Sequence, residues 1–169
     1  YGGGEGLKLV MVHAGGFGKN GGLGKHTLAR CKTALEVPGK KRFLILADGP
    51  EPGTGLPICT VMRNWLINNG VQPEDIITPS SPRADNSIGE VVEAMTYLVG
   101  RIPHEELLVS SSWWHIVPRL WVIWRKYGKG ATKPKFVLAP DMPTPRQCFR
   151  EILGTLAILL GRTGPRFTR

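Results

Sequence analysis

The sequence predicts an α/β fold, a Rossmann-like three-layer α/β/α sandwich around a mostly parallel five-stranded sheet. Short apolar segments alternate along the chain with longer segments of helical spacing, and Gly, Pro or Asn residues separate the two kinds. Right-handed crossovers between parallel strands place helices on both faces of such a sheet. With 169 residues, 41% of them hydrophobic, the chain is long enough to bury one sizeable core.

Five short apolar segments are expected to be strands covered on both faces. The first ends in glycines, the third is the weakest of the set, and all are too short to be helices. Each is followed by a segment whose apolar residues recur at helical spacing. The expected strands are 7–13, 42–47, 75–78, 107–110 and 136–139, and the expected helices are 26–37, 56–69, 87–100, 117–127 and 145–160.

Residue types at the segment ends support these boundaries. Gly39 and Gly70 are typical of the residue that stops a helix, and Asp85 or Asn86 is typical of a helix cap. Pro118 fits the first turn of the fourth helix, because proline lacks the amide hydrogen that this turn leaves unused.

Composition also predicts the domain organisation. We expect residues 7–161 to form a single domain, after a flexible segment 1–6 and before a basic, solvated tail 162–169. The longest apolar run, 152–160, is far shorter than the roughly 20 residues of a membrane-crossing helix, so no transmembrane segment is expected. A cytoplasmic or membrane-peripheral location fits this pattern, and the oligomeric state stays open.

The net charge and the spacing of the cysteines limit the kinds of binding partner and of chemical site that the sequence predicts. Lys and Arg number 22 against 13 Asp and Glu, and the resulting net charge of +9 favours phosphorylated ligands, nucleic acid or acidic lipid head groups. Cys31, Cys59 and Cys148 are far apart in sequence, so we expect free thiols in a reducing compartment. The spacing of the His and Cys residues indicates no metal site.

The first loop, 14–27, combines six glycines with two lysines between a strand and a helix. This composition lets backbone amides approach an anion closely. The loop contains a G-x-G-x-x-G pattern that begins at Gly16, and Asp48 closes the second strand where a dinucleotide-binding fold has its ribose-binding acid. Gly22 and Gly24 lengthen the loop beyond that fold's tight turn, so the match is loose.

A second polar cluster follows the fourth strand. Serines 110–112, His115 and Arg119 are expected around the start of a helix, which is a plausible seat for a phosphate or carboxylate. Four large apolar residues follow at helical spacing, and we expect them to pack in the core. They are Trp114, Val117, Trp121 and Trp124.

Five motifs in residues 9–127 occur in the order found in one protein family. Two glycines end the first strand, an arginine precedes an Ala-Leu pair in the first helix, and a glycine-containing turn ends the second strand. A later helix opens with Asn-Ser, and the fourth strand leads into serines, a histidine and an arginine. These positions are Gly15, Gly16, Arg30, Ala34, Leu35, Ala47, Asp48, Gly49, Asn86, Ser87, Ser110, Ser111, His115 and Arg119.

This order resembles the SanA/YdcF-like family, a domain of unknown function that includes ElyC. Asp48 stands where the family usually has Ser, Gly89 and Glu90 replace Glu-Asn, and the His115-to-Arg119 spacing is one residue longer, as in a divergent member. The resemblance implies a Rossmann-like sandwich with a polar pocket at the strand ends. It also implies a link to bacterial envelope and peptidoglycan precursor metabolism.

The leading hypothesis is a protein that binds a phosphorylated or otherwise anionic small molecule at the carboxyl ends of the strands, as a hydrolase or transferase. His115 and Asp48 are the candidate catalytic residues. The candidate ligand-binding residues are Gly15, Gly16, Gly18, Lys25, Gly49, Asn86, Ser87, Ser111 and Arg119.

Two alternatives remain open. The basic residues in 125–135 and 162–169 favour a non-enzymatic nucleic-acid or scaffold-binding module, although no RNP-like, KH-like or zinc-finger pattern is present. The glycine loop and Asp48 favour a nucleotide or S-adenosylmethionine binding protein. The sequence identifies no cofactor.

Overall fold

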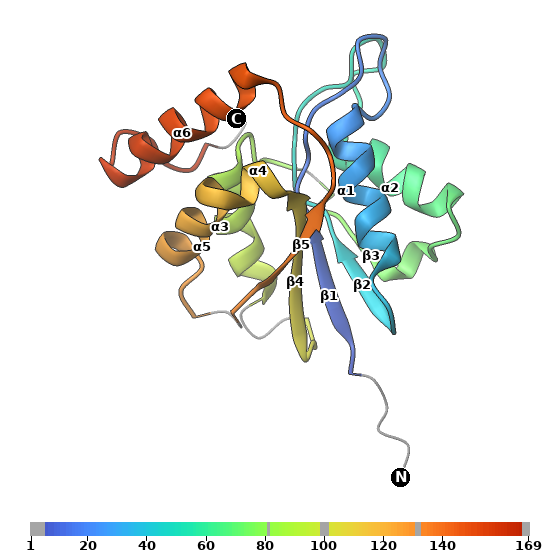
Figure 1. Cartoon of the computed structure of the whole chain (residues 1–169). Coiled ribbons are helices and arrows are strands. Elements are labelled where there is room, and N and C mark those ends of the chain that lie inside the picture. Colours follow the sequence, from blue (N-terminus) through green and yellow to red (C-terminus); the bar gives the residue numbers. More distant parts are fainter. Residues whose placement is uncertain (1–5, 81, 99–101, 131–132, 167–169) are drawn as a thin grey trace.

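The computed structural model describes residues 6–80, 82–98, 102–130 and 133–166. Five parallel strands form one sheet in the order β3-β2-β1-β4-β5 (Figure 1). The sheet confirms the Rossmann-like α/β class, because strand and helix alternate along the chain and all paired strands are parallel. The strands are β1 (Lys8–Val12), β2 (Lys41–Leu44), β3 (Ile76–Ile77), β4 (Glu106–Ser112) and β5 (Lys135–Ala139).

Helices cover both faces of the sheet. Figure 1 shows α1 and α2 on one face and α3, α5 and α6 on the other. Each of the five expected helices has a counterpart in the structure. The helical elements are α1 (Lys25–Glu36), α2 (Ile58–Asn68), η1 (Pro73–Asp75), α3 (Ser87–Leu98), α4 (Trp113–His115), η2 (Ile116–Leu120), α5 (Trp121–Tyr127) and α6 (Pro145–Leu159).

Two buried clusters separate the three layers. Leu9 and Met11 of β1 belong to the cluster under α3 and α5, whereas Val10 and Val12 belong to the cluster under α1 and α2. This alternation follows from the two-residue period of a strand. Burying one such aliphatic side chain contributes about 1.5–3 kcal/mol, so the central strand holds both helical layers in place.

The helix boundaries agree with the capping residues seen in the sequence. Gly70, with a φ angle of 91°, directly follows the Asn69 C-cap of α2, as expected for the residue that stops a helix. Gly39, with a φ angle of 83°, lies two residues beyond the Val37 C-cap of α1, in the turn that leads to β2. Of the two cap candidates for α3, Asn86 fills the position, since its side-chain oxygen accepts the Gly89 amide at 2.7 Å.

The segment 113–127 differs from the expectation of one continuous helix over 117–127. Val117 has φ −109° and ψ 114°, which divides the segment into α4, the wide turn η2 and α5. The physical reason is Pro118, because a proline disfavours helical backbone at the residue before it. The interruption also breaks the expected apolar stripe: Trp114 and Trp124 are buried, whereas Val117 and Trp121 are 66% and 49% exposed.

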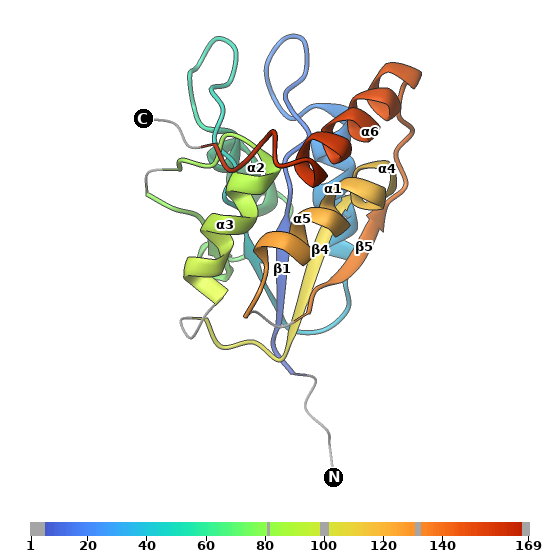
Figure 2. The same cartoon turned by 90° about the vertical axis from the view of Figure 1, so that its left-hand side faces the viewer.

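The last helix, α6, packs on η2 and α5 at the carboxyl end of the sheet (Figure 2). The segment after it, expected to be a solvated tail, folds back as far as residue 166. Asn86 Nδ2 donates to the Gly164 carbonyl at 3.1 Å, and the Asp85 amide donates to the Arg166 carbonyl at 3.0 Å. In the described parts of the chain, no helix has the length and apolar composition to cross a membrane.

The three cysteines are free thiols, as the sequence predicts. Burial raises the pKa of Cys31 to about 12 and that of Cys59 to about 11. Both thiols therefore stay protonated at neutral pH and belong to the core.

Candidate functional site

A pocket opens at the carboxyl ends of β1 and β4, where the strand order of the sheet reverses. Chain connections leave in opposite directions at this point, and open α/β sheets bind ligands in the crevice between them. The pocket has a volume of about 230 Å³. Its lining residues come from the segments after β1 and β4 and from α1, α3 and α6, and they are Ala14, Gly15, Arg30, Ser87, Trp114, His115, Arg119, Gln147, Arg150 and Glu151.

Three of these residues form a hydrogen-bonded chain, Ser87–His115–Glu151. The His115 Nδ1 atom lies 2.7 Å from Glu151 Oε2, and its Nε2 atom lies 3.0 Å from Ser87 Oγ. An ionised carboxylate only accepts hydrogen bonds, so Nδ1 carries the proton and donates it to Glu151. Nε2 of the neutral ring then accepts from the Ser87 hydroxyl, which is the arrangement in which a histidine removes a proton from a serine.

The surroundings keep His115 neutral and Glu151 ionised. Burial lowers the pKa of His115 to about 4 and outweighs the hydrogen bond that His115 donates to Glu151, which raises it. Burial alone would raise the pKa of Glu151, but its hydrogen bonds and charge contacts with His115 and Arg119 hold it below its usual value. At neutral pH the chain therefore contains a free base next to a hydroxyl.

The guanidinium of Arg30 forms part of the pocket wall. Arg30 is 2% exposed, and its Nε and Nη1 atoms donate to Ser112 Oγ at 2.9 Å and to the Ala14 carbonyl at 2.6 Å. Burial lowers the pKa of Arg30 to about 10, so the group stays charged at neutral pH. Gly15 lies against it, since a Cβ at this position would be 3.2 Å from the Arg30 guanidinium carbon and 2.8 Å from His26 Cβ.

Two further arginines line the pocket from η2 and α6. Arg119 Nη1 donates to Glu151 Oε1 at 3.2 Å, so Glu151 joins both His115 and Arg119. Gly154 on α6 makes room for this guanidinium, because a Cβ there would lie 3.0 Å from its central carbon. Arg150 is exposed on α6, and the lining residues together carry three guanidinium groups and one carboxylate.

Two other histidine–carboxylate pairs lie behind the pocket. His13 Nδ1 and Glu90 Oε2 are 2.7 Å apart, and both side chains are buried. His26 Nδ1 pairs with Asp141, whose Oδ2 atom also accepts from Ser112 Oγ at 2.8 Å, while His26 Nε2 lies 2.9 Å from Gln147 Nε2. These pairs fix the ends of β1, β4 and β5 around the site.

The structure brings four of the sequence-predicted site residues together in this pocket. They are Gly15, Ser87, His115 and Arg119. They converge because β1 and β4 are neighbours and because the first turn of α3 lies beside α4.

The remaining predicted residues lie elsewhere. Asp48 and Gly49 follow β2, and the Asp48 amide donates to the Ala84 carbonyl at 2.9 Å. The amides of the glycine loop bond mainly within the loop itself, as in Gly18 to the Gly22 carbonyl at 3.0 Å. Lys25 is exposed, Asn86 caps α3, Ser111 is fully buried in β4, and Gly16 accepts from Thr27 Oγ1 at 2.7 Å.

Sequence reasoning did not assign a site role to Arg30, Gln147, Arg150 and Glu151. The signal available for α6 was the spacing of residues 147, 150, 151 and 154, which places polar groups and a glycine on one face of an otherwise apolar helix. That face lines the pocket, so the polar side of the helix lies against the rest of the protein.

Comparison of the chain with models of protein families, with curated proteins and with solved structures finds no match. The geometry of the pocket is therefore the basis for assigning a function.

Proposed function

We propose that this chain binds a phosphorylated or otherwise anionic small molecule in the pocket and transfers its phosphoryl group to Ser87, as a hydrolase or transferase. The observation that carries the proposal is the Ser87–His115–Glu151 chain, which opens on a wall of three arginines. The resemblance to the SanA/YdcF-like family, as a divergent member, adds support through His115, Arg119 and the polar pocket that it implies.

Binding would depend on charge. Guanidinium groups form paired hydrogen bonds with phosphate oxygens, and they stay charged over the whole physiological range. Arg30 is held rigidly by three acceptors, whereas Arg150 is exposed and has no structural partner among the hydrogen bonds described for α6. Glu151 is already neutralised by Arg119, so Arg30 and Arg150 supply the positive charge for a ligand.

The chemical step follows from the proton positions. Ser87 Oγ attacks the phosphorus and forms an O–P bond, the bond from phosphorus to the leaving oxygen breaks, and His115 Nε2 takes the Ser87 proton. Protonated His115 passes that proton to the leaving oxygen. Water, or an acceptor alcohol in a transferase, then attacks the phosphorus of the phosphoserine while His115 Nε2 takes its proton. The bond from phosphorus to Ser87 Oγ breaks, and His115 returns the proton to Ser87 Oγ, which restores the hydroxyl. The arginines stabilise the charge on the phosphoryl oxygens in both steps.

Binding is tested by titrating inorganic phosphate into the full chain by calorimetry. Arg150→Ala should weaken the affinity about tenfold or more, because a charge-assisted hydrogen bond is lost. Arg146→Ala, on the same helix but outside the pocket lining, should leave it unchanged. Equal affinities of the wild type, Arg150→Ala and Arg146→Ala for phosphate would show that phosphate does not bind in this pocket.

The chemical step is tested by incubating the chain with p-nitrophenyl phosphate, quenching in acid and measuring the intact mass. We expect a gain of one phosphoryl group that Ser87→Ala abolishes and that Ser80→Ala, which changes an exposed serine, does not affect. If the chain binds phosphate but forms no phosphoryl adduct and shows no turnover, it is a binding protein and Ser87 is not a nucleophile.

A further inference from the structure

The net charge of the chain is confined to its C-terminal part. Residues 1–106 carry eleven Lys and Arg and eleven Asp and Glu, whereas residues 107–169 carry eleven Lys and Arg and two acids. Those two acids, Asp141 and Glu151, have side chains only 8% and 11% exposed and are paired with histidines. The surface described for 107–130 and 133–166 therefore presents basic side chains without exposed carboxylates.

The same part of the chain exposes an apolar face on α6. Six large apolar side chains recur at helical spacing along this helix and its C-cap, and each is about half exposed or more. The opposite face carries Gln147, Glu151 and Thr155 and turns toward the protein. We call the exposed set the outward stripe: Phe149, Ile152, Leu153, Leu156, Leu159 and Leu160.

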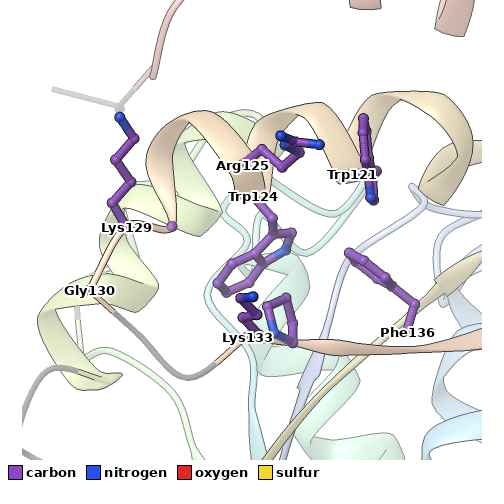
Figure 3. A pocket seen from close by; sticks show the side chains of 9 residues that line it. Trp121, Trp124, Arg125, Lys129, Gly130, Lys133 and Phe136 are labelled. Atoms are coloured by element: carbon purple, nitrogen blue, oxygen red, sulfur yellow. The ribbon is translucent and has the colours of Figure 1, made fainter.

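A hollow of about 550 Å³ between α5 and β5 adds cations and aromatic rings to this surface. Figure 3 shows Trp121 and Arg125 of α5 on one side of the hollow and Phe136 of β5 on the other. The Arg125 guanidinium lies 4.6 Å from the centre of the Trp121 ring, and Lys129 and Lys133 also line the hollow. Tryptophan rings and basic side chains together are typical of surfaces that meet lipid head groups.

The stripe and the hollow belong to elements that are packed together. Helix α6 rests on η2 and α5, and Lys126 Nζ of α5 donates to the Ile158 carbonyl of α6 at 3.0 Å. The stripe and the hollow therefore lie on neighbouring elements of the structure.

We propose that the outward stripe and the hollow beside it form one surface that docks on an anionic lipid bilayer. The stripe enters the boundary between head groups and acyl chains, as the apolar face of an interfacial helix does. The surrounding lysines and arginines attract the negative lipids and orient the domain. This inference does not depend on the proposed function of the pocket.

Other occupants fit the surface less well. A second copy of the chain would bring two strongly basic surfaces against each other, and like charges oppose such an interface. A nucleic acid would complement the charge of the lysines and arginines. It would leave the outward stripe exposed to water, because its backbone offers phosphates and no apolar face.

Co-sedimentation of the full chain with lipid vesicles tests the proposal. We expect binding to vesicles of phosphatidylcholine mixed with phosphatidylglycerol, little binding to phosphatidylcholine alone, and release by added salt. The double variant Leu153→Glu/Leu156→Glu should lower the partition coefficient about tenfold or more, since charges replace apolar contacts. Both positions are exposed, so the fold should be kept, and a thermal melt checks this.

Matched controls use exposed positions outside the surface. Leu56→Glu, at an apolar residue that is 41% exposed, and Lys32→Glu on α1 should leave vesicle binding unchanged. Lys129→Glu/Lys133→Glu should weaken binding to the anionic vesicles without changing the stripe.

Three results would overturn the inference. The first is absence of sedimentation with anionic vesicles. The second is a dimer in analytical ultracentrifugation that the stripe variant dissociates, which would identify a second copy as the occupant. The third is RNA binding with vesicle binding unaffected by the stripe variant, which would assign the basic residues to nucleic acid.

Discussion

The pairs His115–Glu151 and His13–Glu90 are built alike but have different surroundings. In both, Nδ1 of the histidine lies 2.7 Å from a buried glutamate oxygen. Nε2 of His115 faces the Ser87 hydroxyl and the pocket, whereas Nε2 of His13 has no hydrogen-bond partner in the described part of the chain. The ring centres are only 6.4 Å apart. The two pairs thus differ mainly in whether Nε2 of the histidine can be reached from the pocket. His115 can react because its Nε2 is accessible, whereas His13 serves to stabilise the fold.

The largest expected difference between the pairs concerns turnover. His115→Ala should lower the rate with p-nitrophenyl phosphate by about a thousandfold or more, because Ser87 loses its base. His13 does not line the pocket, so His13→Ala should act on stability and leave the rate of the folded fraction much closer to that of the wild type. Equal losses of rate for His115→Ala and His13→Ala in steady-state assays would show that the two pairs do not differ in their role in turnover.

The reverse difference is expected in stability. His13→Ala leaves the carboxylate of Glu90, which is 4% exposed, without its partner, and this should lower the free energy of unfolding by about 3–5 kcal/mol. Urea denaturation measures the change. The double variant His13→Leu/Glu90→Leu should recover most of it, since neither polar member of the pair is then left buried without the other. A cost below about 1 kcal/mol for the single variant would show that the pair is not structural.

The pH dependence sharpens the assignment of His115. Its pKa is about 4 in the folded chain, against 6.5 when exposed, because burial and the charge of Arg30 disfavour the proton more than Glu151 favours it. The unfolded chain therefore takes up a proton between pH 6.5 and 4 that the folded chain does not, and stability falls by up to about 3 kcal/mol as the pH falls through this window. Glu151 adds a loss at lower pH, since its folded pKa lies below its usual value.

Urea denaturation at pH 7 and pH 5 tests this prediction. His115→Gln should show a smaller loss of stability between these two values than the wild type. Turnover should persist at pH 5, where His115 is still the free base. A rate that falls with a midpoint near 6.5 would mean that His115 is exposed to solvent.

The smallest expected effect concerns Gly154. An alanine there places a Cβ 3.0 Å from the Arg119 guanidinium, so that side chain must shift by a few tenths of an ångström. Helix propensity favours the alanine by up to about 1 kcal/mol, and we therefore expect equal or higher thermal stability with weaker phosphate binding. Stability and affinity that both fall would indicate that Gly154 is needed by the fold more than by the site.

The sequence predicted the parts of the site that lie next to strand ends. His115, Arg119, Ser87 and Gly15 all follow a strand or open a helix, and their positions follow from the rule that parallel strands present their carboxyl ends at one edge. Asp48 also follows a strand, but β2 is separated from β4 by β1 in the sheet. The order of strands across a sheet is a long-range property that local patterns do not encode.

The contribution of α6 could not be predicted for a related reason. Glu151 is 36 residues from His115, and its role depends on the packing of α6 against η2. The shape of η2 depends in turn on Pro118, which divides a segment that otherwise has helical spacing. The same division leaves Trp121 on the surface instead of in the core.

NMR of the histidine ring nitrogens in labelled protein tests the central claim most directly. A neutral His115 ring at pH 7, protonated at Nδ1, whose Nε2 signal shifts on Ser87→Ala and on addition of phosphate while the His13 signals stay constant, is the predicted result. A charged His115 ring at pH 7, or one that responds neither to the loss of Ser87 nor to phosphate, would contradict it.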